Sequence, residues 1–185
     1  INMNVPKIII SNNYNIDGDI NKAITQRAES LKDEFISAVN TAAERNEEIN
    51  TLDIDTEVLL ATPKLISLSF TATSHLAGTV DNDSERTFLI FDLINGKLLL
   101  EDNELFRDDL AWSKAVRTIK TSLLSNYQGD PNCDLLFAPK HNGFAASCIG
   151  VDWSRGGEHL SITEDIPISM IQELLAPSIL SDILQ

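Results

Sequence analysis

The stretch from His75 to Glu85 contains the side chains whose types and spacing are best suited to chemistry. Asp81, Asp83 and Glu85 alternate along the chain and follow a single histidine. A histidine with a nearby carboxylate is a pairing that general acid–base catalysis uses, and neighbouring acids also attract a weakly bound cation. A polar loop tip between two strands, with the histidine as an ordinary surface residue, explains the same pattern without either activity. The candidate binding residues in this stretch are His75, Asp81, Asp83 and Glu85.

Trp153 and Arg155 form a second candidate at the predicted end of a strand, just before Gly156-Gly157. An exposed aromatic side chain beside an arginine is typical of an anchor for a binding partner. The alternative is partial burial of the indole at the end of the sheet, because tryptophan is usually mostly buried. Trp112, in contrast, lies on the apolar face of a predicted helix, and we expect it in the core.

Residues 13–21 look like the first nine positions of a calcium-binding loop. Oxygen-bearing side chains alternate from Asn13 to Asp17, and Gly18 occupies the sixth position. The twelfth position of such a loop supplies a bidentate carboxylate, and here it is Ile24. We therefore expect a turn followed by a helix cap, and no metal site.

Motifs for catalysis are absent from the sequence. None of the three histidines, His75, His141 and His159, has a partner at metal-ligand spacing, and there is no Gly-x-Ser-x-Gly elbow or phosphate-binding loop. We expect a protein that is not an enzyme and that carries no cofactor. The alternative is a hydrolase that uses the loop carboxylates and His75.

The charge of the chain restricts its partners. There are 28 acidic and 14 basic residues among 185, which gives a net charge of −14. Such a surface repels nucleic acids and anionic membranes, and it speeds the encounter with a cationic partner. The same acids also serve simply to keep a surface domain soluble. No apolar run approaches the roughly 20 residues that span a bilayer.

Hydrophobic periodicity predicts a mixed set of elements. A short strand is expected over Lys7–Ser11, and a turn follows. A long helix from about Asp19 to Glu44 should bury Ile24, Leu31 and Phe35 on one face. Four strands should form an antiparallel meander with Asn95-Gly96 as its last turn; they are expected over Leu52–Leu60, Lys64–Thr73, Thr87–Leu93 and Lys97–Leu100.

The second half of the chain should begin with a helix from about Asp108 to Ser125. The elements expected after it are strands over Asp134–Ala138, Phe144–Trp153 and Leu160–Ile166, a short helix over Ile168–Leu175 and a last helical turn over Ser178–Leu184. This order predicts an α+β fold: an antiparallel sheet with a long N-terminal helix and a second helix packed against it. We expect a single domain over residues 1–185, with a strand–helix–strand portion at 1–62 and a sheet–helix–hairpin portion at 63–185.

Three segments carry a resemblance to a known family: Leu65–Phe70, Arg86–Lys97 and Leu105–Phe106. They follow the pattern S-L-x-F, then T-F-x-x-(F/Y)-D-L-x-x-G-K-x-L, then L-F. The chain resembles the extracytoplasmic domain of lysozyme-sensing anti-sigma factors. The same domain accompanies peptidoglycan deacetylases and occurs in uncharacterised bacterial lipoproteins. Where the family often has Gly-Gly-Ala-His, this chain reads Ser74-His75-Leu76-Ala77-Gly78, with the histidine displaced.

The resemblance implies an extracytoplasmic location, whether periplasmic, secreted or lipid-anchored through a removed N-terminal segment. It also implies an antiparallel sheet with a helix against it and, in the anti-sigma factors, protein binding. The deacetylase activity belongs to a neighbouring domain, whose His-x-x-x-His motif is absent here. We therefore expect a non-catalytic binding module of the cell envelope. Its partner would be a basic protein such as a lysozyme, or cell-wall glycan.

Cys133 and Cys148 are the two cysteines of the chain. If Ala138 and Gly143 close a four-residue turn, the register of the hairpin places the two thiols directly opposite each other, within reach of a disulfide. The oxidising compartment that the resemblance implies would let the bond persist. Two small buried residues that merely face one another, or a bulge that turns one of them away, are the alternatives.

Overall fold

The computed structural model describes residues 1–9, 14–42, 49–77, 83–94, 97–99, 102–129, 131–152, 154 and 158–184. Its contacts group the chain into two compact units. The first unit contains Ile1–Glu57 and Phe70–Arg86, and the second contains Val58–Ser69 and Thr87–Gln185. Three strands contribute residues to both units, so the unit boundaries do not follow the ends of elements.

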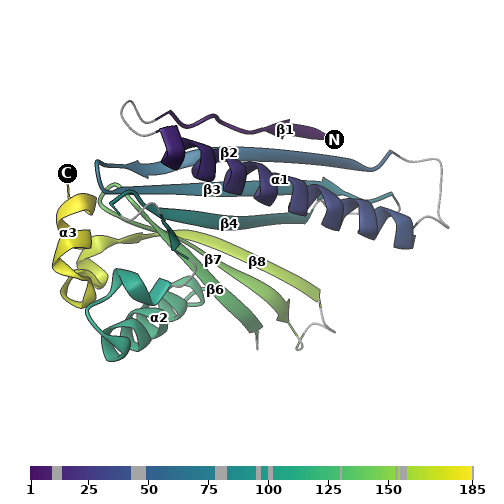
Figure 1. Ribbon diagram of the computed structural model, residues 1–185. Coiled ribbons are helices and arrows are strands. Elements are labelled where there is room, and N and C mark those ends of the chain that lie inside the picture. Colours follow the sequence, from purple (N-terminus) through teal and green to yellow (C-terminus); the bar gives the residue numbers. More distant parts are fainter. Residues whose placement is uncertain are drawn as a thin grey trace. The chain divides into compact units, whose positions relative to one another are not determined.

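A five-stranded sheet has the order β1-β2-β3-β4-β5, of which Figure 1 labels β1 to β4. Its strands span Asn2–Asn4, Thr51–Ala61, Leu65–His75, Asp83–Asp92 and Lys97–Leu99. The β2–β3 turn is tight, because the Thr62 amide donates to the Leu65 carbonyl at 2.9 Å and the Thr62 hydroxyl accepts from the Leu65 amide at 3.0 Å. β4 and β5 pair antiparallel, and the order β2-β3-β4-β5 is the predicted order of the meander.

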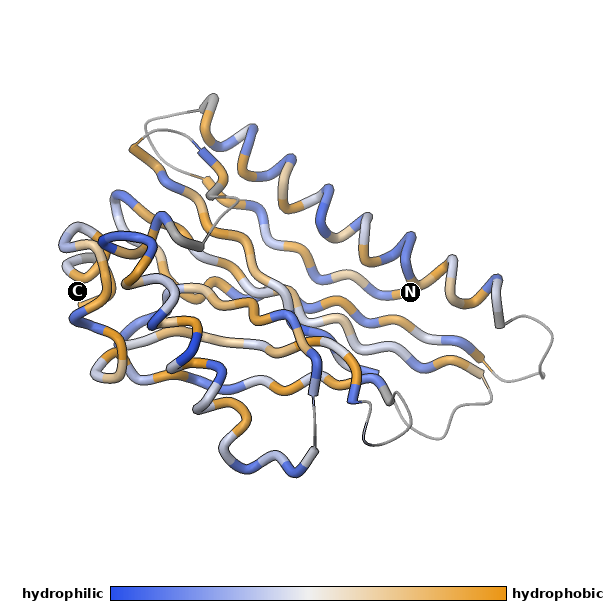
Figure 2. The backbone as a smooth tube through the Cα atoms, turned by 90° about the horizontal axis from the view of Figure 1, so that it is seen from below, coloured by the Kyte–Doolittle hydropathy of each residue, from blue (hydrophilic) through white to orange (hydrophobic). Residues whose placement is uncertain are grey.

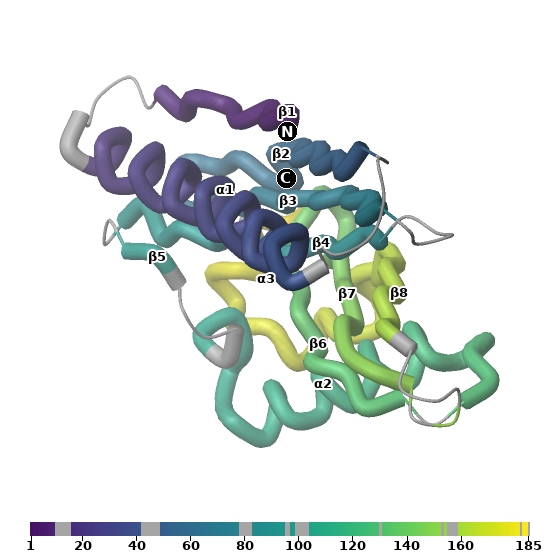
Figure 3. Tube along the Cα trace, turned by 90° about the vertical axis from the view of Figure 1, so that its right-hand side faces the viewer, coloured from purple at the N-terminus to yellow at the C-terminus, as the bar shows by residue number. Residues whose placement is uncertain are grey.

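The N-terminal strand lies elsewhere than predicted. β1 is formed by Asn2–Asn4 and pairs parallel to β2, with Met3 opposite Ile54 (Figure 3). Lys7 and Ile9, which were expected in a strand, have no regular structure, and the rest of that prediction falls on residues outside the described ranges. This segment is held by Asn21 of the long helix instead of by a strand partner. The Asn21 side chain accepts from the Ile8 amide at 2.8 Å and donates to the Ile8 carbonyl at 2.7 Å.

The long helix α1 spans Tyr14–Ala42 and begins five residues before the predicted start. Its apolar face contains Ile24, Leu31 and Phe35, which are all buried as predicted. Figure 2 shows hydrophobic and hydrophilic residues alternating along this helix. The predicted turn before Gly18 is therefore wrong, since its described part is helical: the gain from burying one face exceeds the roughly 1 kcal/mol that an internal glycine costs.

The second unit contains a three-stranded antiparallel sheet of order β6-β7-β8, over Pro131–Lys140, Gly143–Asp152 and Glu158–Pro167. Helix α2, Asp109–Leu123, contacts β7 and β8. Its N-terminus is capped by Asp108, whose carboxylate accepts from the Ala111 amide at 2.7 Å. The α+β fold class is thus confirmed.

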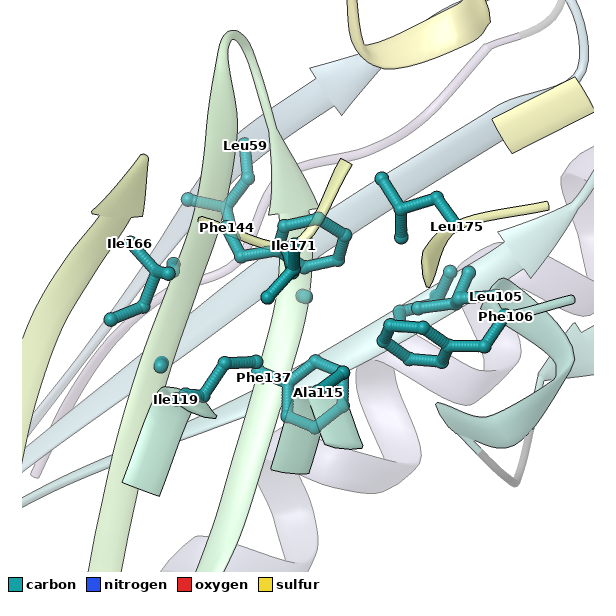
Figure 4. Packing of buried hydrophobic residues seen from close by; sticks show 14 of the residues in the cluster. Leu59, Leu105, Phe106, Ala115, Ile119, Phe137, Phe144, Ile166, Ile171 and Leu175 are labelled. Carbon is teal, nitrogen blue, oxygen red and sulfur yellow. The ribbon is translucent and has the colours of Figure 1, made fainter. Parts of the chain in front are cut away.

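The core of the second unit is aromatic at its centre. The ring of Phe137 contacts those of Phe106 and Phe144 edge to face, with centroids 5.9 and 6.0 Å apart (Figure 4). Ala115 and Ile119 of α2 belong to the same buried cluster. Trp112 packs against the cluster and is half-buried, in keeping with the expected core position.

The predicted helix over Ile168–Leu175 forms two 3-10 turns instead, η3 at Ile168–Met170 and η4 at Gln172–Leu174. The segment pairs with the end of η1, which spans Asp102–Leu105, and with the residues after it. The Ala176 amide donates to the Leu105 carbonyl at 3.0 Å, and the Arg107 amide donates to the Leu174 carbonyl at 3.1 Å. This pairing satisfies backbone groups that a continuous helix would have used. Pro177 then begins α3, Pro177–Ile183, at a position where its missing amide costs nothing.

Candidate functional site

A groove in the first unit brings together α1, β2, β3 and the start of β4. It has a volume of about 170 Å³. The apolar residues that line it include Leu31, Phe35, Leu52, Ala72 and Leu76. We call it the acidic groove because three carboxylates, from Glu34, Asp83 and Glu85, also line it.

The positions of these groups follow from the periodicity of a helix and from the alternation of side chains along a strand. On α1, Leu31 and Phe35 are four residues apart and share one face, and Glu34 lies at the edge of that face. On β4, Asp83 and Glu85 are two residues apart, so their side chains leave the strand on the same side. The groove therefore has one carboxylate on its helix wall and two on its strand wall.

Arg27 links the two walls. Its guanidinium lies 3.7 Å from the Glu34 carboxylate and donates to the Glu85 carboxylate at 3.3 Å. The Glu85 side chain is 30% exposed and the Glu34 side chain is 57% exposed, so solvent screens both pairs.

A neighbouring cation on α1 is engaged elsewhere. Lys32 donates to Glu29, one helical turn earlier, and this hydrogen bond raises the pKa of the Lys32 ammonium above its ordinary value. Lys32 does not line the groove. Its charge therefore does not compensate the groove carboxylates directly.

His75 does not join the carboxylates of the groove. It is the last residue of β3, and Ser74 and Leu76 on either side of it line the groove while His75 does not. Because side chains alternate along a strand, His75 points to the opposite face of β3. Of the candidate residues before Arg86, Asp83 and Glu85 are thus brought together and His75 is separated from them. Asp81 lies outside the described residues.

Trp153 and Arg155 also lie outside the described residues, but their neighbours form a buried polar contact. Asp152, at the end of β7, is fully buried and accepts from the Tyr127 hydroxyl. Its other oxygen accepts from the Ser154 amide at 2.9 Å and from the Ser154 hydroxyl at 2.7 Å. This carboxylate fixes the backbone on both sides of position 153.

The part of the calcium-like segment that the structure describes is the first turns of α1, so the backbone does not wrap around a cation there. Across the described ranges, no three His, Cys, Asp or Glu side chains lie close enough together to hold a metal ion.

The predicted disulfide between Cys133 and Cys148 is present, with their Cα atoms 5.4 Å apart. The predicted register is wrong, however: Cys133 lies opposite Gly150, and Cys148 lies opposite Leu135. The hairpin turn has two residues and not four, because Lys140 pairs with Gly143.

The reason is that Pro139 lies in the strand. β6 is an edge strand of its sheet, where proline is tolerated, and the turn strains only Asn142, at a φ of 62° that asparagine adopts more readily than most residues. The cysteines therefore pair diagonally. The missing side chain of Gly150 lets the strands approach, since a Cβ there would lie 2.6 Å from the Cys133 Cα.

Sequence reasoning missed Glu34 and Arg27 as residues of the site. Arg27 and Glu85 are 58 positions apart in the sequence, which hides their contact. Periodicity identifies which face of an element is buried, and it does not identify which distant strand lies beside it.

Comparison with known proteins gives similarity in fold. The sequence matches no family model and no curated protein. A solved structure of a DUF3298 family member from Bacteroides fragilis has a TM-score of 0.46 and 16% identity, covering 94% of this chain and 74% of its own. A DUF3298 family protein from Pseudomonas aeruginosa has a TM-score of 0.45 and 14% identity, covering 76% of this chain and 68% of its own.

Proposed function

We propose that this protein is a non-catalytic binding module of the bacterial cell envelope whose partner is cationic, such as a lysozyme. The acidic groove is the observation that carries the proposal, because it combines apolar side chains with three carboxylates. The net charge of −14 extends the same preference over the whole chain. A basic protein fits this charge better than an uncharged cell-wall glycan does.

Two further features concern location. The Cys133–Cys148 disulfide favours an extracytoplasmic protein, because such bonds persist in oxidising compartments and are rare in the cytosol. No helix of the described residues is long and apolar enough to cross a membrane.

The absence of catalysis is part of the proposal. A hydrolase that uses His75 with the loop carboxylates needs those groups within hydrogen-bond reach of one substrate. β3 presents His75 on the face opposite to the groove that Asp83 and Glu85 line. This geometry supports binding at the groove over acid–base chemistry there.

The experiment is to measure association with hen lysozyme as salt is raised. The screening length falls from about 10 Å at 0.1 M salt to about 3 Å at 1 M, so steering by the acidic surface predicts a steep fall in the association rate. An acidic protein of similar size serves as the control and should not bind. A rate that does not change with salt contradicts steering, and a lack of binding to wild-type protein excludes lysozyme as the partner.

A further inference from the structure

The turn between β6 and β7 contains an asparagine that is followed directly by a glycine. His141 and Asn142 are the two turn residues, and both are exposed. Gly143 is the first residue of β7. Asparagine is a thermolabile residue, and a following glycine favours its deamidation because no side chain crowds the glycine nitrogen. The turn therefore holds the chemical groups of a modification site.

The reaction needs only water. The Gly143 nitrogen attacks the Cγ atom of Asn142, and the new C–N bond closes a succinimide ring while the side-chain nitrogen leaves as ammonia. The proton that the Gly143 nitrogen loses balances the proton that the departing nitrogen takes up. Water then adds to one of the two ring carbonyls and breaks its bond to nitrogen, which leaves aspartate or isoaspartate at position 142.

The fold holds the backbone of Asn142 from both of its polar groups. The Asn142 amide donates to the Ile183 carbonyl at 3.3 Å, and the Asn142 carbonyl accepts from the Ile168 amide at 3.1 Å. Both partners belong to the segment that follows β8. Because this segment fixes Asn142 at a φ of 62°, it also limits how the Asn142 side chain approaches the next nitrogen.

Gly143 is fixed from the other side of the same peptide bond. It is buried and lies opposite Lys140 on β6 and opposite Pro167 on β8. A Cβ at Gly143 would lie 2.2 Å from the Ile166 carbonyl oxygen, so the backbone has little room to rotate. The Gly143 nitrogen therefore reaches the Asn142 Cγ atom only after the turn has opened locally.

The end of α3 is the part of this clasp that opens most readily. α3 has seven residues, and helices this short owe their stability to packing. Its last residue, Ile183, is buried and supplies the carbonyl that Asn142 binds. Segments near a chain end unfold locally at a lower free energy than the central strands of a sheet.

We propose that Asn142 is a deamidation site whose rate is set by the docking of α3. While α3 is docked, the turn stays closed and the reaction is suppressed. When its end is released, Gly143 attacks Asn142. The aspartate product adds one negative charge to the turn. The isoaspartate product routes the backbone through the former Cβ atom, which a two-residue turn cannot absorb without losing the Lys140–Gly143 pair. No partner takes part, so the outcome is independent of whether the protein binds lysozyme.

The test compares the full chain in native buffer and in urea at the same pH and temperature. Peptide mass spectrometry follows the conversion of Asn142, and chromatography separates aspartate from isoaspartate. We expect the native rate to be lower by roughly tenfold or more, because the reaction proceeds through the small open fraction. Asn95-Gly96, the other such pair in the sequence, reports the intrinsic reactivity in urea. Equal rates at Asn142 in both states overturn the proposal, and so does an unreactive Asn142 in urea where Asn95 reacts.

Variants of α3 test the clasp. Ile183→Ala removes a buried side chain and should raise the native rate at Asn142 several-fold, together with faster hydrogen exchange at the Asn142 and Ile168 amides. Leu184→Ala removes an exposed side chain from the next position and should change neither rate. If Ile183→Ala does not fold by circular dichroism, Leu180→Ala replaces it, because Leu180 is a partly buried contact of the same helix.

The two readouts contradict the proposal in different ways. Faster exchange at the Asn142 amide without faster deamidation would show that opening of the turn does not limit the reaction. Unchanged exchange and unchanged deamidation in a folded α3 variant would show that α3 does not hold the turn closed. Either result overturns the assignment of α3 as the element that sets the rate.

Discussion

Gly18 is an exposed glycine inside α1, and a Cβ added there would meet no atom within 4 Å. Gly18 makes residues 13–21 resemble a calcium loop in sequence, although Gly18 itself lies inside helix α1. Glycine loses more backbone entropy in a helix than alanine does, and here no close approach requires it. Local composition was misleading at this position because the burial of Ile20 and Ile24 on the next turns outweighs it.

We therefore expect Gly18→Ala to raise the free energy of unfolding by about 0.5 to 1 kcal/mol. Chemical denaturation monitored by circular dichroism measures the change. Gly143→Ala is a suitable contrast, because a Cβ at that position would lie 2.2 Å from the Ile166 carbonyl oxygen and should destabilise the protein. A loss of stability in Gly18→Ala would show that this glycine has a role that the helix does not explain.

Hydrophobic periodicity within a segment predicted some of the secondary-structure elements. Elements that form only by pairing with residues distant in the sequence were not predicted. Leu52 and Ile54 alternate with exposed acids and identified β2, and the spacing of Leu31 and Phe35 identified α1. β1 could not be found this way, because Asn2-Met3-Asn4 is polar and becomes a strand only by pairing with β2. The acidic groove escaped prediction for the same reason, since it depends on where α1 lies beside β4.

The segment after β1 depends on Asn21, whose carboxamide bonds the Ile8 amide and carbonyl and also donates to the Asp17 carbonyl at 2.7 Å. Asn21→Ala should lower the free energy of unfolding by about 1 to 3 kcal/mol, because part-buried backbone groups lose their partner. Amide hydrogen exchange at Ile8 should accelerate in this variant. Thr25→Ala, which removes an exposed hydroxyl from the same helix, provides the control. Unchanged exchange at Ile8 would contradict the anchoring role.

For the chain as a whole, the disulfide is the one covalent link between distant residues of the described ranges. It joins residues 15 apart in sequence. The chain-entropy model gives about 3 kcal/mol for a loop of this length, so reduction should lower the free energy of unfolding by at most that amount. Unfolding with and without a phosphine reductant measures the difference. Thiol titration of the unfolded, unreduced protein should detect no free thiol, and two free thiols would contradict both the bond and the extracytoplasmic location.

The β6–β7 turn has a consequence for truncated forms of the chain. The Asn142 amide donates to the Ile183 carbonyl at 3.3 Å, so the turn contacts the end of α3. Neither cysteine takes part in this contact, and we expect the disulfide to form without it. A purified chain that ends at Ala176, refolded under oxidising conditions, should resist alkylation at both thiols; reactive thiols there would mean that the hairpin requires α3.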